Sequence, residues 1–275
     1  MRGGIMNNYF GFKEVKLFKA FILFILFSII IPSIIVDFNL PYSDNYNFLS
    51  LCSNIIMFMF LLFMFRTSKD KVSELFKDFL RKVKFSEVIN VVITQLSISL
   101  GSVLLLVGIL YFINPDNLNI MLNSDNNNVT TLSKFILYFL LVTISAPLVE
   151  ELLFRAIFFK RMSRYFSTVI SMLVSSFIFG ILHIELAVIG AIMFAIANCI
   201  LYIKYKNILI PILTHFTNNL ISILPQMNFS SSSSIFMTKD IAMSALLIGL
   251  ILFSFGIFLF IKFVLLNKDY LKYSF

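Results

Sequence analysis

Successive apolar runs, each long enough to cross a bilayer, constrain the fold of this chain more than any other feature of its sequence. A helix of about 20 apolar residues spans the hydrocarbon core with every backbone polar group bonded inside the segment. The chain is 59% hydrophobic and only 13% charged, which leaves too little polar surface for a water-soluble domain. We therefore predict an all-α fold, a polytopic transmembrane helix bundle of about eight spans. The predicted spans are 18–36, 48–65, 87–113, 134–159, 167–184, 186–203, 208–225 and 241–263.

The spans fall into three parts. An N-terminal region, 1–133, contains three spans and an amphipathic segment, 68–85, which we expect either on the cytoplasmic leaflet or in the cytosol as a solvated helix. The central region, 134–225, contains four spans, and 226–275 contains a Ser-rich loop and the last span. The exposed connectors predicted from low-complexity composition are 114–128 and 230–234.

Basic residues gather at alternate ends of the spans. If the N-terminus lies in the cytoplasm, the cytoplasmic segments contain all of the 22 Lys and Arg residues except Lys134, Lys239 and Arg155. This asymmetry is what the positive-inside rule describes, so we predict a multi-pass protein of the cell membrane with both termini in the cytoplasm. The formal charge of +8 forms no stripe with interleaved aromatics. The lipid bilayer is therefore the expected partner of these charges, and nucleic acid is not.

The stretch "APLVEELLFRAIFF", 146–159, places three ionisable side chains inside an apolar span. A lone charge at mid-bilayer costs about 2.5–3.5 kcal/mol on insertion scales, so such residues usually have a function. Glu151 and Arg155 are four residues apart and can neutralise each other on one helix face. Glu150 is rotated away by about 100°, and Pro147 is expected to bend the helix. We interpret the pair as structural and Glu150 as available for chemistry. The alternative is a buried polar staple formed by all three.

The only two histidines of the chain, His183 and His215, both lie in predicted apolar helices. A buried histidine is more often a hydrogen-bonded core residue than a ligand, but both histidines lie in the half of the chain that contains Glu150. Two histidines and a glutamate from separate helices could hold zinc with an open position for water. Without a metal, Glu150 could deprotonate a water held by the histidines. Asn219, one turn beyond His215, could stabilise an oxyanion. The residues alone do not decide between these mechanisms.

Three motifs in the central region resemble those of a known protein family. The sequence "EELLFR" is similar to an EExxxR motif, "FGILH" to an FxxxH motif at Phe179 and His183, and "HFTNN" to an HxxxN motif at His215 and Asn219. Their order resembles that of the CAAX-protease and bacteriocin-processing family (CPBP, formerly Abi) of intramembrane proteases. The resemblance covers 134–225, and the rest of the chain matches only as generic spans.

The resemblance implies an eight-helix bundle whose catalytic cavity lies within the membrane and opens to the cytoplasm. It implies cleavage near the end of prenylated proteins in eukaryotic members, and peptide maturation or self-immunity against bacteriocins in bacterial ones. Glu150 would be the catalytic acid/base, Glu151 its partner held by Arg155, and the histidines the ligands of a metal or a water. The site residues that the resemblance implies are Glu150, Glu151, Arg155, His183, His215 and Asn219.

The leading hypothesis is an intramembrane endopeptidase of a peptide or membrane-protein substrate. It would be a metalloprotease with Zn²⁺ bound by His183, His215 and Glu150, or a glutamate-type enzyme without a cofactor. One alternative is a proton- or ion-coupled transporter that uses the buried Glu and His residues. The other is a non-catalytic membrane scaffold or immunity protein.

The depth of His183 adds one structural expectation. Counted from 167 at 1.5 Å per residue, His183 would lie roughly 24 Å from the cytoplasmic surface, deeper than Glu150 and His215. The helix therefore either enters the bilayer late, with about 163–172 in the cytosol, or tilts strongly. We predict late entry, because the polar stretch "KRMSRYFS" precedes the helix.

Overall fold

The structure, a computed structural model, describes residues 17–65, 68–124, 131–183, 188–227 and 236–272, and its regular elements there are all helical. The predicted all-α class is therefore confirmed. The elements are α1 (Leu17–Asp37), α2 (Tyr46–Met64), α3 (Lys69–Lys82), α4 (Phe85–Ile113), α5 (Pro115–Ser124), α6 (Leu132–Phe139), η1 (Leu140–Ser145), α7 (Ala146–Glu151), η2 (Leu152–Phe159), α8 (Lys160–Met162), α9 (Thr168–Leu182), α10 (Val188–Tyr205), α11 (Leu209–Ile223), η3 (Leu224–Met227), α12 (Lys239–Asn267) and η4 (Lys268–Lys272).

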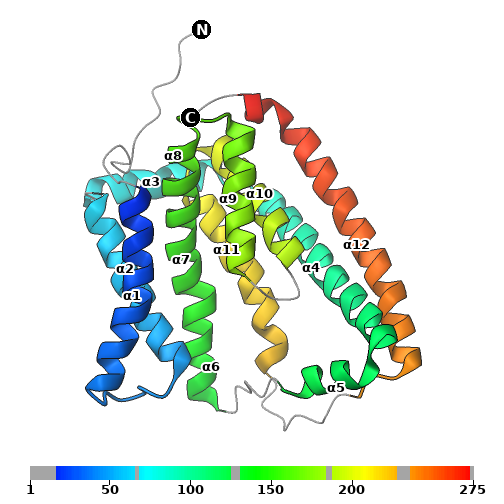
Figure 1. The fold of residues 1–275 in the computed structure, drawn as a ribbon. Helices are drawn as coiled ribbons and strands as arrows, with labels where there is room; N and C mark the ends of the chain where they lie inside the picture. Colours follow the sequence, from blue (N-terminus) through cyan, green and yellow to red (C-terminus); the bar gives the residue numbers. More distant parts are fainter. Residues whose placement is uncertain (1–16, 66–67, 125–130, 184–187, 228–235, 273–275) are drawn as a thin grey trace.

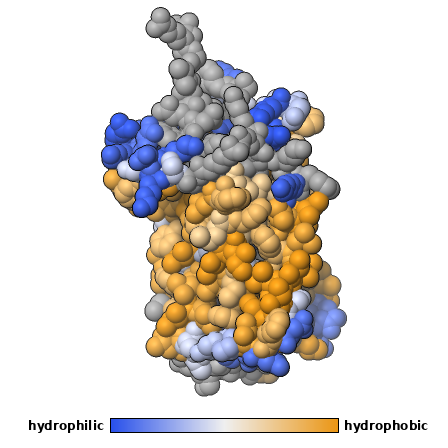
Figure 2. Space-filling view, turned by 90° about the vertical axis from the view of Figure 1, so that its left-hand side faces the viewer, coloured by the Kyte–Doolittle hydropathy of each residue, from blue (hydrophilic) through white to orange (hydrophobic). Residues whose placement is uncertain are grey.

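Within these described ranges, six helical rods are long and apolar enough to cross a membrane: α1, α2, α4, the rod from α6 to α8, α10, and α12 with η4. Two shorter apolar helices, α9 and α11, complete a set of eight that corresponds to the eight predicted spans. Figure 2 shows a broad apolar belt between hydrophilic ends on one face of the molecule. Such a belt is the surface that a bilayer solvates, so the chain is a multi-pass membrane protein.

Helix α1 begins and α12 ends at the same end of the bundle, where α3 and α8 also lie (Figure 1). Helix α3 is the predicted amphipathic segment: it buries Leu75 and exposes Lys77. Its basic residues mark this end as the one that the positive-inside rule assigns to the cytoplasm. The cytoplasmic orientation itself stays a prediction.

One of the two predicted connectors is wrong in part. The stretch 114–128 contains helix α5, Pro115–Ser124. Asn114 caps this helix, because its side-chain oxygen accepts a hydrogen bond from the backbone N–H of Asn117 at 3.0 Å, and Pro suits a first helical position. The prediction from low-complexity composition therefore overlooked a local signal for the start of a helix, the capping Asn114 followed by Pro115. The other predicted connector, 230–234, lies outside the described residues.

Glycine residues allow α4 and α12 to pack with their backbones in close contact on one side of the bundle (Figure 1). A Cβ atom added at Gly101 would lie 2.5 Å from the backbone nitrogen of Phe253, and one at Gly249 would lie 2.8 Å from that of Leu105. No side chain fits at such distances. This is the small-residue packing that membrane helices use when lipid gives them no hydrophobic drive to associate.

The rod from α6 to α8 is central to the bundle and contains the charged turn. Its α-helical segments are interrupted by two π-helical segments, η1 and η2, which flank α7. Pro147 has no backbone N–H to donate within the rod, which contributes to the irregular hydrogen bonding before α7. Segments of π-helix inside α-helices occur frequently at functional sites. The rod therefore positions its charged residues on a backbone that departs from a regular α-helix.

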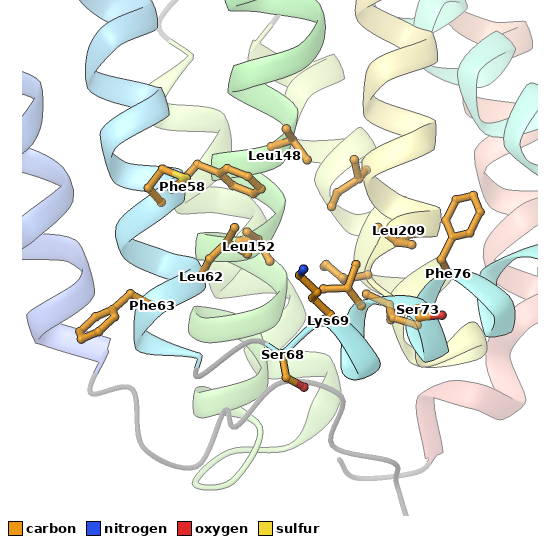
Figure 3. Close-up of a pocket in the computed structure, with 15 residues that line it drawn as sticks. Phe58, Leu62, Phe63, Ser68, Lys69, Ser73, Phe76, Leu148, Leu152 and Leu209 are labelled. Atoms are coloured by element: carbon orange, nitrogen blue, oxygen red, sulfur yellow. The ribbon is translucent and has the colours of Figure 1, made fainter.

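A cavity of about 850 Å³ lies between α2, α3, α11 and the central rod (Figure 3). Its walls are mainly aliphatic and aromatic, with Phe58 and Leu62 of α2 facing Leu148 and Leu152 of the rod. Among its lining residues, the polar ones all come from the start of α3. The cavity therefore has an apolar interior and a polar end.

The polar segment before α9 separates that helix from the rod. Helix α8 ends at Met162, a turn follows, and Ser167 caps α9 by accepting a hydrogen bond from the backbone N–H of Ile170 at 3.3 Å. Tyr165 is 75% exposed and Phe166 is 53% exposed. The location of 163–172 in the cytosol is untested and stays a prediction.

Candidate active site

Glu151 and Arg155 form the ion pair that their spacing predicts, and both are completely enclosed. Arg155 Nε lies 3.0 Å from Glu151 Oε2, and their side chains are 1% and 0% exposed. Within the described structure the guanidinium makes no hydrogen bond of good geometry, so the contact is an ion pair by distance alone. Its carbon Cζ lies 4.4 Å from the centre of the Phe179 ring, a cation–π contact that ties the rod to α9.

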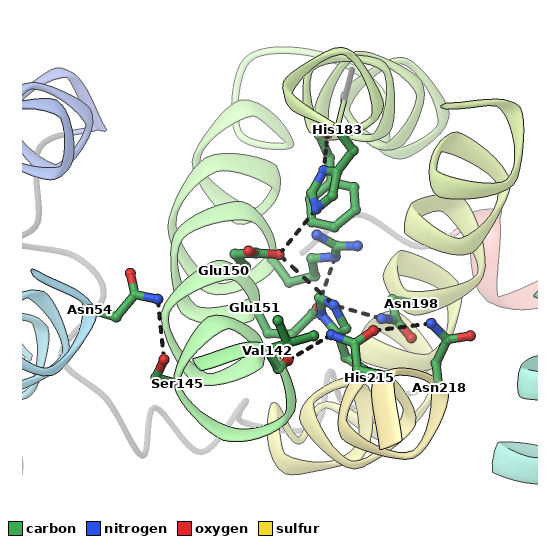
Figure 4. Close-up of polar contacts among 12 residues, drawn as sticks. Asn54, Val142, Ser145, Glu150, Glu151, His183, Asn198, His215 and Asn218 are labelled. Carbon is green, nitrogen blue, oxygen red and sulfur yellow. Dashed lines mark hydrogen bonds and ion pairs between the residues drawn. The ribbon is translucent and has the colours of Figure 1, made fainter. Parts of the chain in front are cut away.

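The second oxygen of Glu151 is shared by two donors from other helices (Figure 4). His215 Nδ1 on α11 lies 2.9 Å from Glu151 Oε1, and Asn198 Nδ2 on α10 donates to the same oxygen at 3.2 Å. With Arg155 on its other oxygen, this carboxylate joins three helices at one buried point. Its full enclosure and its contacts with His215, Asn198 and Arg155 favour an orienting role over direct chemistry.

Glu150 points towards both histidines. Its Oε2 lies 3.7 Å from His183 Nε2 and 3.9 Å from His215 Nε2. The Glu150 side chain is 21% exposed and that of His183 is 39% exposed, whereas that of His215 is 5% exposed. The structure therefore brings together the three residues that the sequence predicts, each from a different element. In the described ranges Glu150 Oε2, the atom that faces both rings, is itself buried and has no hydrogen-bond partner.

Hydrogen bonds at Nδ1 fix which ring nitrogen of each histidine bears the proton. His183 Nδ1 lies 2.8 Å from the carbonyl oxygen of Phe179, and His215 Nδ1 lies next to the Glu151 carboxylate. Both neighbours accept hydrogen bonds, so Nδ1 donates in each ring, and in a neutral imidazole Nε2 then has a lone pair. Glu150 Oε2 and the two Nε2 atoms are thus three acceptors that face one another. Such a set is complementary to the O–H groups of water or to a cation.

Two phenylalanines hold the imidazole rings in place. The Phe179 ring lies 4.3 Å from the His183 ring, centre to centre, and 6.0 Å from that of His215. The Phe194 ring on α10 meets His215 edge to face at 5.3 Å. Aromatic packing with the Nδ1 hydrogen bonds restricts both rings, so their Nε2 atoms keep their direction towards Glu150.

Asn219 lies close to the site but is engaged elsewhere. Its Nδ2 donates to the carbonyl oxygen of Val142 in η1 at 2.8 Å, and its Oδ1 accepts from Asn218 Nδ2 at 3.1 Å. It makes no hydrogen bond with either glutamate or either histidine in the described ranges. One amide proton of Asn219 therefore holds the π-helical segment, and the predicted oxyanion contact would depend on the other.

Sequence reasoning missed Asn198, which is completely buried and bonds Glu151. The available signal was a single amide inside the apolar run "FAIANCILYI", since a polar side chain at such a position usually has a partner or a function. Asn54 was missed as well. It donates to Ser145 at 3.2 Å and links α2 to the central rod.

The predicted zinc ligands His183, His215 and Glu150 have donor atoms of the kinds that zinc accepts. Among the described residues, no group of three or more His, Cys, Asp or Glu side chains could hold a metal ion as positioned. The predicted metal site therefore stays untested, and no step of the chemistry below uses a metal.

A comparison against protein families finds a match within this chain. Residues 132–221 match the family described as type II CAAX prenyl endopeptidase Rce1-like. The resemblance to CAAX proteases is thereby confirmed for this core. It includes every predicted site residue from Glu150 to Asn219. The match supports an intramembrane protease of the CAAX type and a substrate that is a membrane-associated peptide. No curated protein and no solved structure matches the chain.

Proposed function

We propose that this protein is an intramembrane endopeptidase in which Glu150 activates a water for attack on a peptide bond. The observation that carries the proposal is the convergence of Glu150 Oε2 with the Nε2 atoms of His183 and His215, at 3.7 and 3.9 Å. A water at their meeting point would donate one hydrogen bond to an imidazole and direct its other proton at the carboxylate. This is the geometry that general-base catalysis requires.

The chemistry proceeds as an addition followed by an elimination. Glu150 takes a proton from the water while the oxygen attacks the scissile carbonyl carbon, which gives a tetrahedral intermediate with an oxyanion. The carboxylic acid of Glu150 then returns the proton to the amide nitrogen as the C–N bond breaks. The free proton of the Asn219 amide is our candidate for the oxyanion donor.

Glu151 has a positioning role in this proposal. Its carboxylate accepts the Nδ1 proton of His215, and Arg155 and Asn198 hold that carboxylate in turn. A carboxylate–histidine pair of this kind fixes the tautomer that presents Nε2 to the reacting water. The two adjacent glutamates therefore have different roles: the partly buried Glu150 reacts, and the enclosed Glu151 orients His215.

For the substrate, we propose a membrane-associated peptide processed in the manner of CAAX proteins. Peptide maturation and self-immunity against bacteriocins are the related biological roles that the family resemblance suggests. The support for a CAAX-like substrate is the family match over 132–221, whose description specifies a prenyl endopeptidase. Zinc assistance is a second mechanistic proposal, and its support is the donor chemistry of the two Nε2 atoms and Glu150.

The test uses the purified protein in proteoliposomes and an internally quenched, prenylated CAAX peptide. We expect the wild type to cleave it, and we expect Glu150→Gln, His183→Ala and His215→Ala to lower kcat at least roughly 100-fold, the lower bound for losing a general base. Glu74→Gln is the matched control, because Glu74 is exposed on α3. Undiminished cleavage by Glu150→Gln contradicts the mechanism.

Two further arms separate the open alternatives. The same peptide without its prenyl group tests the substrate class: equal cleavage of both forms favours peptide maturation over CAAX-like processing. Metal analysis of the purified protein, with activity measured before and after chelation, tests zinc. Stoichiometric zinc with loss of activity on chelation would favour the metalloprotease mechanism over the glutamate-type one.

A further inference from the structure

The cavity between α2, α3, α11 and the central rod is apolar except at one end, where the exposed Lys69 is among its lining residues. Twelve of its fifteen lining residues are apolar, and the other three are Ser68, Lys69 and Ser73 at the start of α3. Figure 3 shows the nitrogen of Lys69 directed into the cavity, towards Leu62 and Leu152. None of the ion pairs in the described ranges includes Lys69. The cavity therefore offers a positive charge beside a hydrocarbon-like interior.

This cavity is distinct from the candidate active site. The central rod lines it with Leu148 and Leu152, one helical turn apart on the same face. Glu150 is two residues from Leu148 and so points about 200° away around the helix. No predicted site residue lines the cavity. A molecule in it would therefore pack behind the turn that holds Glu150, away from the atoms that react.

The chemistry of the walls specifies an amphiphile with an anionic head. A cavity of about 850 Å³ is large enough for a ligand of substantial size. The cation lies at the polar end of the cavity, on a helix that has five basic residues against three acidic ones. Anionic lipids collect at basic segments next to a membrane surface. An anionic head on Lys69 and a chain along the apolar walls satisfy both features at once.

We propose that this cavity binds an anionic phospholipid of the surrounding leaflet, with its phosphate on Lys69. One acyl chain lies along Phe58, Leu62 and Leu152, in contact with the back of the central rod. The lipid thereby braces the turn that contains Glu150 from the side opposite the histidines. The proposal concerns binding, so it stands or fails independently of proteolysis.

The test measures retained lipid by native mass spectrometry. The full-length protein is delipidated, reconstituted in vesicles of equal parts phosphatidylglycerol and phosphatidylcholine, and released into the gas phase. We expect the wild type to retain one phosphatidylglycerol in preference to phosphatidylcholine. Lys69→Glu should lower that retention roughly fivefold or more, the factor expected for one cationic side chain at an anionic leaflet. The matched control is Lys77→Glu, because Lys77 lies on the same helix, is exposed and does not line the cavity.

A second variant tests the apolar part of the site without changing charge. Leu62→Trp places a larger ring in the cavity and should displace the acyl chain, so we expect loss of bound lipid with the melting temperature in detergent close to that of the wild type. Phosphatidylglycerol vesicles should raise the melting temperature of the wild type and of Lys77→Glu, and should leave that of Lys69→Glu unchanged.

Three results would overturn the proposal. The first is equal retention of the two lipids by the wild type, which would leave no role for the cation. The second is an equal loss in Lys69→Glu and Lys77→Glu, which would indicate general surface attraction. The third is full retention of phosphatidylglycerol by Leu62→Trp, since the acyl chain would then lie elsewhere. None of these comparisons uses a cleavage assay. If the lipid-binding proposal fails, the proposed protease function is therefore not affected.

Discussion

Replacing Glu151 by Gln should destabilise the protein strongly, and replacing Arg155 as well should restore most of the stability. Both side chains are enclosed, at 0% and 1% exposed. The Gln variant keeps an oxygen for His215 and Asn198 but removes the charge that neutralises Arg155. A buried charge left without its partner costs about 3–5 kcal/mol in free energy of unfolding. For a chain of this size that corresponds to a fall of roughly 6–20 °C in melting temperature.

The double variant Glu151→Gln/Arg155→Met removes both charges and keeps a side chain of similar length against Phe179. Because a buried ion pair and an apolar replacement are often nearly equal in stability, we expect the double variant to melt closer to the wild type than Glu151→Gln does. The difference measures the coupling between the two residues in a double-mutant cycle. Arg155→Met alone completes the cycle.

A thiol-reactive fluorogenic dye can follow the unfolding of these variants. The chain has no Trp, but Cys199 is completely buried and becomes reactive only when the bundle opens. Cys52 is partly exposed and would be replaced by Ser in every variant. Two outcomes would refute the reasoning. One is a Glu151→Gln variant that melts within about 2 °C of the wild type. The other is a double variant whose loss equals the sum of the two single losses, which would show no coupling.

The remaining predictions concern packing, orientation and depth. Gly101→Leu should lower the melting temperature and separate α4 from α12, because a Cβ there would lie 2.5 Å from the Phe253 nitrogen; wild-type stability would show that the helices pack differently. Asn198→Ala should reduce kcat by about tenfold, the lower end of the loss seen when a group supporting a site ligand is removed; an unchanged kcat would exclude this role. Tyr165→Cys should be labelled from the cytosolic side by a membrane-impermeant maleimide, and protection there would mean that α9 enters the bilayer earlier than predicted.

The course of the helices could be read from the sequence because each span is a continuous apolar run. The run predicted at 208–225, for example, corresponds to α11, Leu209–Ile223. A lipid-facing helix needs apolar residues on all its exposed sides, so the positions where polar residues begin in the sequence predict where the helix ends. Helix α5 was not predicted, because it is short and polar and its main sequence signal is an N-terminal cap.

For the site, spacing predicted contacts within a helix better than contacts between helices. Glu151 and Arg155 lie on one helix, so a four-residue spacing was enough to predict their ion pair. The meeting of Glu150 with His183 and His215 depends on how three elements pack, and only the scarcity of histidine and the family motifs indicated it. Asn198 gave a weaker signal, since one amide in an apolar helix does not identify its partner. The hydrogen bond from Asn219 to Val142 depends on the π-helical backbone of η1, and no residue pattern in the sequence predicts a π-helical segment there.

The central claim is that the protein hydrolyses peptide bonds inside the membrane with a water that Glu150 activates. A survey of protein termini in cells tests this claim without requiring that the substrate be known. Cells expressing the wild type, Glu150→Gln or Glu74→Gln at equal levels would be compared by quantitative mass spectrometry of new N- and C-termini. We predict a set of membrane-associated termini that is present with the wild type and with Glu74→Gln and is absent with Glu150→Gln. Identical termini in all three would contradict the claim and favour a non-catalytic scaffold.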